Sequence, residues 1–185
     1  MRTRRIEKTL SLCGLGTVLF LNGCVMKSTY NTMLQQQQAI ESSLHSEINA
    51  DQVEIKQLEN GIQVRLSSAL LYREGAIDLT PAGKAALKKV APQFATETYE
   101  IDVIGNTDNL KTVGELAKRY PTNWELAGAR AAVVVRYLQE NSVAPSRMRA
   151  ISAGEYHPVA SNDTPDGRAR NRRTDILLRP TQPPQ

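Results

Sequence analysis

Hydrophobic and polar residues alternate in several short stretches of this chain, and a period of two predicts half-buried β-strands. The clearest case is a hairpin, in which alternating residues at 53–55 and 62–66 flank the two-residue turn signal Asn60-Gly61. Three later segments also have strand character: Tyr99–Val103, Met148–Ala153 and Thr174–Leu178. The chain from residue 53 onward is therefore expected to contain five strands.

Two longer segments combine a helical start signal with helical spacing of apolar residues. Thr80-Pro81 supplies an N-cap and a proline at the first helical position, and the predicted helix continues from Ala82 to Phe94. Thr122 and Glu125 have capping-box spacing and begin a second helix that runs to about Asn141. The order β-β-α-β-α-β-β predicts an α/β fold, a two-layer sandwich in which helices cover one face of a mixed sheet.

The segment before the first strand is polar and rich in glutamine. Ile40, Leu44 and Ile48 are spaced four apart, which predicts a single amphipathic helix. We interpret residues 24–52 as a tether, which would reach roughly 90 Å if extended and about 40 Å as a helix. Residues 53–180 are then the folded domain, and residues 181–185 are a predicted disordered tail.

The N-terminus predicts a targeting segment. Basic residues precede the apolar stretch Leu10–Leu21, which is short for a transmembrane helix of about 20 apolar residues. Leu21-Asn22-Gly23-Cys24 resembles a bacterial lipobox, so residues 1–23 are a predicted lipoprotein signal peptide and Cys24 is the predicted lipidation site. Val25, rather than an aspartate, follows the cysteine, and by the same resemblance this favours the outer membrane. The alternative is that the apolar stretch stays as an uncleaved anchor.

Charge and cysteine content narrow the class of partner. The formal net charge of +4 falls to +1 when residues 1–23, with their four basic residues and one acidic residue, are set aside. A nearly neutral domain gives no reason to expect nucleic acid as a partner. Cys13 lies in the predicted leader and Cys24 would carry lipid, so the domain has no cysteine for a disulfide or a metal site. We expect no cofactor and no metal.

The strongest functional signal is a set of three polar blocks in the second half of the chain. They are Gly105-Asn106-Thr107-Asp108, Thr122-Asn123-Trp124-Glu125-Leu126-Ala127-Gly128-Ala129-Arg130-Ala131, and 162–173, which ends in Gly167-Arg168-Ala169-Arg170-Asn171-Arg172-Arg173. One acid, one arginine on a helix and an arginine-rich loop suit the binding of a small zwitterion. The blocks resemble the OmpA-like peptidoglycan-binding family in content and order. The resemblance spans about two thirds of the chain and implies an OmpA C-terminal-like β-α-β-α-β-β core.

The same resemblance implies a ligand and a role for each site residue. The ligand is the peptide stem of peptidoglycan, held through its diaminopimelate, and no bond is made or broken. Asp108 matches the acid that binds the ammonium, and Arg130 matches the arginine whose planar fork binds the carboxylate. Asn123 and Leu126 share a helix face with Arg130, and Thr107 could supply a further donor. The alternative is a structural ion pair, and the acid and the arginine could also pair when the site is empty.

Several residues depart from the family pattern. Asn106 stands where the family usually has histidine, and Ala127 stands where serine is common. Residues 110–122 form a segment that is longer than in typical porin-type members of the family. Its end looks closer to the flagellar stator version of the domain. Tyr72 and Arg73 lie where the family often has Phe-Asp, and because Arg73 departs from that acid neither is a primary candidate.

Other residues have plainer structural interpretations. Trp124, the sole tryptophan, is expected to pack, and Asn123 could also cap its helix. The basic cluster is interpreted as a structural anchor or a glycan contact, because it lacks the interleaved aromatic residues of a nucleic-acid site. Its members are Arg168, Arg170, Arg172 and Arg173.

Three hypotheses about function follow. The first is a lipid-anchored protein that links the outer membrane to peptidoglycan, where even modest affinity gives a durable link because the lipid holds the domain near the wall. The second is a wall-anchoring subunit of an envelope complex such as a secretion or motor assembly, with proteins of that complex as further partners. The third is a wall-cutting enzyme, which we do not expect, since only His45 and His157 are available and no H-E-x-x-H motif is present.

Overall fold

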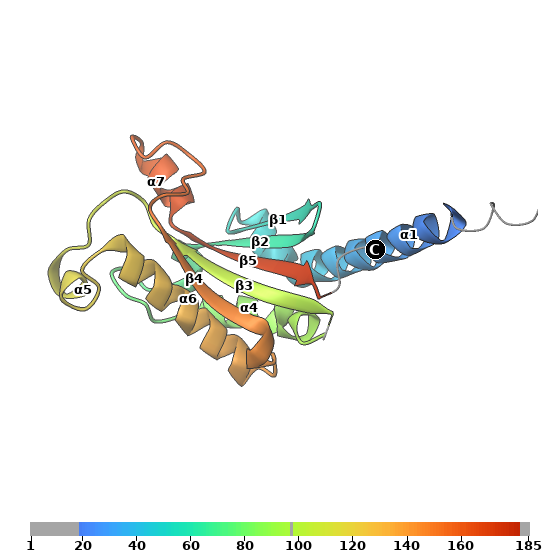
Figure 1. Ribbon diagram of the computed structural model, residues 1–185. Coiled ribbons are helices and arrows are strands. Elements are labelled where there is room, and N and C mark those ends of the chain that lie inside the picture. The colour runs from blue at the N-terminus through green and yellow to red at the C-terminus, as the bar shows by residue number, and fades with distance from the viewer. Residues whose placement is uncertain (1–18, 97, 182–185) are drawn as a thin grey trace, which may run out of the picture.

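A five-stranded mixed sheet is the centre of the fold. The computed structural model describes residues 19–96 and 98–181, with side chains from residue 30 on. In the described part the strand order is β1-β2-β5-β3-β4, so the last strand of the chain lies in the middle of the sheet (Figure 1). The pair β3 and β4 is parallel, and the other neighbours are antiparallel. The strands are β1 (Val53–Leu58), β2 (Gly61–Ser67), β3 (Tyr99–Asn106), β4 (Met148–Gly154) and β5 (Arg173–Pro180).

Helices cover one face of this sheet and bury its alternating apolar residues. The long helices α4 (Pro81–Phe94) and α6 (Asn123–Glu140) lie side by side on that face (Figure 1). Ile101 and Val103 of β3 and Ile176 of β5 are fully buried beneath them. The charged residues between these positions point to the opposite face, as a period of two requires. The predicted α/β two-layer architecture is confirmed.

Both predicted helix starts are confirmed by their hydrogen bonds. The Thr80 hydroxyl accepts from the backbone N–H of Gly83 at 2.8 Å, and Pro81 is the first residue of α4. Thr122 and Glu125 form a complete capping box at the start of α6. Since Thr122 is the N-cap, the capping role suggested for Asn123 is wrong, and the Asn123 side chain is left for other contacts.

The predicted hairpin is present, but its turn lies one residue earlier than Asn60-Gly61 suggested. Leu58 pairs with Gly61, so the two-residue loop is Glu59-Asn60, and Gly61 is the first residue of β2. The reason lies in the neighbouring strand, because a Cβ on Gly61 would come within 2.2 Å of the Leu178 carbonyl oxygen. The glycine therefore serves the close approach of β2 to β5.

Four short helices were not predicted from the sequence. They are α3 (Ser68–Leu71), α5 (Gly114–Arg119), η1 (Pro145–Arg147) and α7 (Pro165–Asn171). Two of them, α5 and α7, lie in segments interpreted as loops. Helix α5 has no buried residue, which explains why the apolar pattern gave no signal for it.

The segment interpreted as a tether is helical and partly joins the core. Helix α1 (Leu19–Ser43) is followed by α2 (His45–Asn49). Ile40 and Leu44 are fully buried in the same cluster as the sheet residues, and Gln36 donates to the Gln93 carbonyl oxygen at 2.7 Å. The end of α1 is thus a third member of the helix layer, whereas its beginning extends away from the sheet (Figure 1). Packing in this fold begins before the predicted boundary at residue 53.

The predicted leader and tail fall largely outside the described residues. Residues 1–18 and 182–185 are not described, and of Cys24 only the backbone, within α1, is described. We found no helix in residues 19–96 and 98–181 with the length and apolar character needed to cross a membrane.

Candidate functional site

The candidate site begins where β3 ends beside the start of α6. Thr107 and Asp108 follow β3 directly, and the N–H of Thr107 donates to the Gly154 carbonyl oxygen of β4 at 2.8 Å. Gly105 allows the helix to come this close to the strand, because a Cβ there would lie 2.1 Å from the Ala127 carbonyl oxygen. The backbone of β3 therefore lies directly against the backbone of α6, and this close approach places Asp108 beside the start of the helix.

A cavity of about 670 Å³ opens at this junction and brings the five predicted site residues together. Those residues are Thr107, Asp108, Asn123, Leu126 and Arg130. The other charged residues that line it are Arg73, Glu74, Lys111 and Arg172. Four cationic and two anionic side chains thus border the cavity, which suits a ligand that carries more carboxylate than ammonium.

Asp108 has a different partner from the one that the sequence suggested. Its carboxylate is almost buried and accepts from Nη1 of Arg172 at 2.6 Å. The other oxygen, Oδ1, accepts from the backbone N–H of Leu110 at 3.1 Å. The structure shows no bond between Asp108 and Arg130, so the suggested pairing of these two side chains in the empty site is wrong.

Arg130 reaches the cavity from the second turn of α6, and its guanidinium makes few hydrogen bonds. Its Nε and Nη2 both donate to one acceptor, the Ala76 carbonyl oxygen, at 3.3 and 3.1 Å. Its Nη1 has no hydrogen-bond partner in residues 19–96 and 98–181. Burial lowers the pKa of the Arg130 guanidinium, which nevertheless stays charged near neutral pH. An arginine with a spare donor in a desolvated cavity is well suited to an incoming carboxylate.

Tyr72 supports Arg130 from below. The guanidinium carbon lies 5.1 Å from the centre of the Tyr72 ring, which is a favourable cation–π arrangement. The Tyr72 hydroxyl donates to the Arg130 carbonyl oxygen at 3.2 Å and lies 2.8 Å from the Thr174 hydroxyl. Burial raises the pKa of Tyr72 to about 12, so the ring is neutral beneath the cation.

Asn123 ties the loop after β3 to the start of α6. Its Nδ2 donates to the carbonyl oxygens of Asp108 at 3.2 Å and Leu110 at 3.0 Å, and also to the Glu155 carboxylate. Thr107 uses its hydroxyl to donate to the Asp108 carbonyl oxygen at 2.9 Å. These two residues therefore hold the backbone of the acid, and Leu126 adds an apolar wall.

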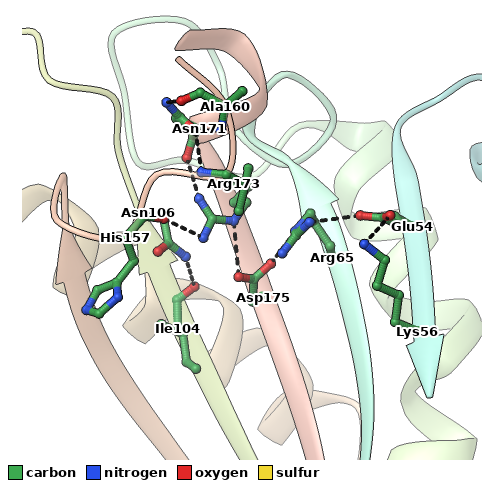
Figure 2. A network of polar contacts seen from close by, with 11 residues as sticks. Glu54, Lys56, Arg65, Ile104, Asn106, His157, Ala160, Asn171, Arg173 and Asp175 are labelled. Carbon is green, nitrogen blue, oxygen red and sulfur yellow. Dashed lines mark hydrogen bonds and ion pairs between the residues drawn. The ribbon is translucent and has the colours of Figure 1, made fainter. Parts of the chain in front are cut away.

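Two of the departures from the family pattern lie beneath the site. Asn106 is buried, and its amide donates back to the Ile104 carbonyl oxygen at 3.2 Å (Figure 2). Ala127 is fully buried against Gly105. Neither side chain lines the cavity.

The arginine-rich block divides between anchoring and the site. Asn171 fastens the loop by accepting from the N–H groups of Val159 and Ala160, and Arg173 lies in a polar network with Asp175 (Figure 2). Arg172, one residue earlier, points to Asp108 instead. The sequence interpretation missed Arg172 as a site residue. Adjacent residues at the start of a strand face opposite sides of the sheet. From this rule, the sequence could have predicted that only one of the two arginines joins the anchoring network.

Trp124 does not pack into the core as expected. It is 47% exposed and stacks on Tyr156, with ring centroids 5.2 Å apart. Its indole lies against Gly154 at the end of the edge strand β4, outside the apolar core.

Among the described residues, no three or more His, Cys, Asp or Glu side chains are arranged to hold a metal ion. The polar side chains that line the cavity carry carboxylate, guanidinium, ammonium, amide and hydroxyl groups.

Comparisons with known proteins agree with this geometry. The OmpA family model matches residues 71–172. The chain is 30% identical over 122 residues to the Peptidoglycan-binding protein ArfA of Mycobacterium tuberculosis (strain ATCC 25618 / H37Rv), covering 65% of this chain and 35% of that protein. It is 36% identical over 126 residues to the Probable lipoprotein YiaD of Escherichia coli (strain K12), covering 68% of this chain and 51% of that protein. It thus spans about half, or less, of the length of these curated relatives.

Among solved structures, the fold is similar to that of the cell wall anchor of the T6SS from Pseudomonas aeruginosa. The TM-score is 0.70 at 26% sequence identity, and the match covers 78% of this chain and 99% of that chain.

Proposed function

The chain belongs to the OmpA family, the family of OmpA-like peptidoglycan-binding domains, and we propose that it binds the stem peptide of peptidoglycan through diaminopimelate, without catalysis. The observation that carries this proposal is the cavity bordered by the Asp108 carboxylate and the Arg130 guanidinium. Diaminopimelate carries an ammonium beside a carboxylate, so one anion and one planar cationic fork match it.

Binding would proceed by an exchange of partners. The ligand ammonium takes the place of Arg172 on the Asp108 carboxylate, and the ligand carboxylate accepts from Arg130. Arg172, whose side chain is 42% exposed, is then free to turn toward the same carboxylate. The Asp108 carboxylate keeps a cationic partner throughout, Arg130 gains an anionic one, and each charge-assisted hydrogen bond contributes roughly 1.5–3 kcal/mol.

The site is tested by co-sedimentation of the detergent-solubilised full chain with purified sacculi. We expect Asp108→Asn and Arg130→Ala to lose most of their sedimentation at a protein concentration where the wild type is largely bound. Two matched controls are exposed residues outside the cavity, Asp166→Asn and Arg136→Ala, the latter on the same helix as Arg130. Equal sedimentation of all four variants would refute the site assignment.

We further propose that the protein is anchored by lipid on Cys24 and so links the outer membrane to the wall. The lipobox-like sequence and the similarity to a protein named as a probable lipoprotein support this. Helix α1 joins the cysteine to the domain, and its residues 24–43 correspond to about 30 Å at 1.5 Å per residue. Mass spectrometry of the mature N-terminus tests it, and an unmodified Cys24 would contradict it.

A second candidate function is a wall-anchoring subunit of a multi-protein envelope complex. The specific observation in its favour is the similarity over 99% of the cell wall anchor of the T6SS. Purification of the native protein from membranes separates the two: stoichiometric partner proteins support the complex, and a protein recovered alone supports the simple link.

A further inference from the structure

An exposed pair of aromatic residues, Trp124 and Tyr156, lies beside the cavity. Trp124 is 47% exposed and Tyr156 is 61% exposed, yet their rings stack at 5.2 Å with an angle of 26° between the planes. Each ring therefore covers one face of the other, and both residues keep a large exposed surface. Exposed clustered aromatic surface is uncommon unless something binds to it.

The backbone holds this pair in place although the core does not cover it. The Trp124 carbonyl oxygen accepts from the Ser152 hydroxyl of β4 at 2.7 Å. The indole lies over Gly154, where a Cβ would be 3.3 Å from its Cδ2 atom. Gly154 has φ of 56°, a conformation that favours glycine and turns the chain toward Tyr156. A platform fixed in this way loses little entropy when a ligand stacks on it.

The pair is continuous with the cavity through one side chain. Asn123 lines the cavity, contacts the Asp108 carbonyl oxygen and immediately precedes Trp124. The same amide donates to the carboxylate of Glu155, which immediately precedes Tyr156. Both aromatic residues therefore flank a network that reaches the acid of the site.

We propose that Trp124 and Tyr156 form a stacking platform for an N-acetylated sugar ring of the glycan strand. This inference rests on the proposed function, since it places the sugar beside a stem peptide in the cavity. A pyranose ring presents a flat face of C–H groups that matches an aromatic ring, and its hydroxyl groups can donate to Glu155.

The chain supplies its own reporter for this interaction. Trp124 is the sole tryptophan, so the fluorescence of the detergent-solubilised full chain reports on the platform alone. The probe is soluble glycan strands from which an amidase has removed the stem peptides. We expect a saturable change in emission for the wild type and for Asp108→Asn, because this probe has no diaminopimelate to bind in the cavity.

A variant set makes the test specific. Tyr156→Ala retains the reporter and should weaken glycan binding by about fivefold or more, on the scale of other ring-stacking contacts. Val159→Ala, an exposed apolar residue on the same loop, is the matched control and should bind as the wild type does. Intact sacculi, sedimented in parallel, carry both glycan and stem peptides, and the loss of sedimentation from the wild type to Asp108→Asn reports on the stem-peptide site.

The outcomes separate the two proposals. Sedimentation with sacculi but no emission change with stripped glycan would overturn the platform and leave the stem-peptide site intact. Stripped glycan binding together with undiminished sedimentation of Asp108→Asn would instead refute that site. Equal glycan affinity of Tyr156→Ala and the wild type would also overturn the platform. So would an emission change that a purified envelope protein produces and the stripped glycan does not.

Discussion

Arg173 and Arg130 are both buried arginines, but they lie in two regions with opposite demands. In the network of Figure 2, Arg173 donates from Nε to Asp175, from Nη1 to the Asn171 carbonyl oxygen and from Nη2 to the His157 carbonyl oxygen. In the cavity, Arg130 shares one carbonyl oxygen between two nitrogens and leaves Nη1 unused within the described residues. Burial lowers the pKa of both guanidinium groups, so burial alone does not distinguish them.

The difference between the two regions lies in how many donors are already satisfied. A saturated arginine stabilises the protein through contacts that cannot be exchanged, whereas an unsaturated one keeps a donor for a ligand. A sequence motif that contains both kinds therefore encodes folding and binding together. Four variants, taken from the largest expected effect to the smallest, test this distinction.

The largest effect is expected in the saturated network. Asp175 pairs with both Arg173 and Arg65, and the side chains of Asp175 and Arg173 are only 6% and 5% exposed. Asp175→Ala leaves a buried guanidinium without its carboxylate, which should cost about 3–5 kcal/mol of unfolding free energy. Urea denaturation measures it. Arg149→Ala, in a pair whose arginine is 54% exposed, is the control and should destabilise the fold much less, because Arg179 still pairs with Asp102. Equal destabilisation by the two variants would remove the distinction.

The second variant, Arg130→Ala, should affect ligand binding more than the stability of the fold. Arg130→Ala should weaken binding to sacculi by about 30-fold or more, because the ligand carboxylate loses its charged partner. Its unfolding free energy should fall by about 1–2 kcal/mol, less than for Asp175→Ala, because Arg130 has no carboxylate partner and loses only two hydrogen bonds to one carbonyl and a cation–π contact with Tyr72. Sedimentation isotherms and urea denaturation on the same preparation give both numbers. A variant that unfolds as readily as Asp175→Ala would assign Arg130 to the structural class.

The third effect concerns the aromatic support of the site and depends on pH. Burial raises the pKa of Tyr72 to about 12 in the folded protein, whereas the unfolded chain titrates near 10. The folded state therefore retains a proton that the unfolded state releases, so this stabilisation is complete below pH 10 and is lost as the pH rises through 12. We expect the unfolding free energy to fall by about 1–3 kcal/mol across that range.

Tyr72→Phe isolates this contribution. Urea denaturation at a series of pH values should show a shallower fall between pH 10 and 12. Some slope should persist, because burial also raises the pKa of Tyr99. A slope identical to that of the wild type would show that Tyr72 titrates normally and is not shielded beneath Arg130.

The smallest effect is expected at Arg172, which borders the cavity and pairs with Asp108. Arg172→Gln removes the partner of Asp108 and one donor for the ligand carboxylate, but it also frees Asp108 for the ligand ammonium. The opposing terms should leave a loss of binding of about three- to tenfold. Arg170→Gln, two residues earlier and exposed, is the control in the same sedimentation assay. A loss as large as that of Arg130→Ala would contradict the exchange of partners.

Much of the fold was predictable because its signals are local. Alternation gave the strands, and the threonine caps with their proline and glutamate partners gave the two long helices. The hairpin turn was misplaced because the position of Gly61 is decided by the Leu178 carbonyl oxygen on a strand distant in sequence. The packing of Ile40 and Leu44 was missed for the same reason, since three spaced apolar residues do not indicate what covers them.

The site shows the same limit. Family resemblance named the acid and the arginine, and the fold brings them to one cavity. Arg172 and Arg173 point in opposite directions where the chain enters β5, and only Arg172 reaches Asp108. The sequence interpretation treated Arg172 and its neighbours as one basic cluster. Trp124 was assigned to packing on its residue type alone, although its indole lies outside the apolar core.

The most direct test of the central claim is a titration of the full chain with meso-diaminopimelate and two analogues. One analogue lacks the ammonium at one end, and the other lacks the carboxylate there. The account predicts that the wild type discriminates against both, that Asp108→Asn loses only its discrimination against the first, and that Arg130→Gln loses only its discrimination against the second. If both variants discriminate as the wild type does, Asp108 and Arg130 do not hold the ligand.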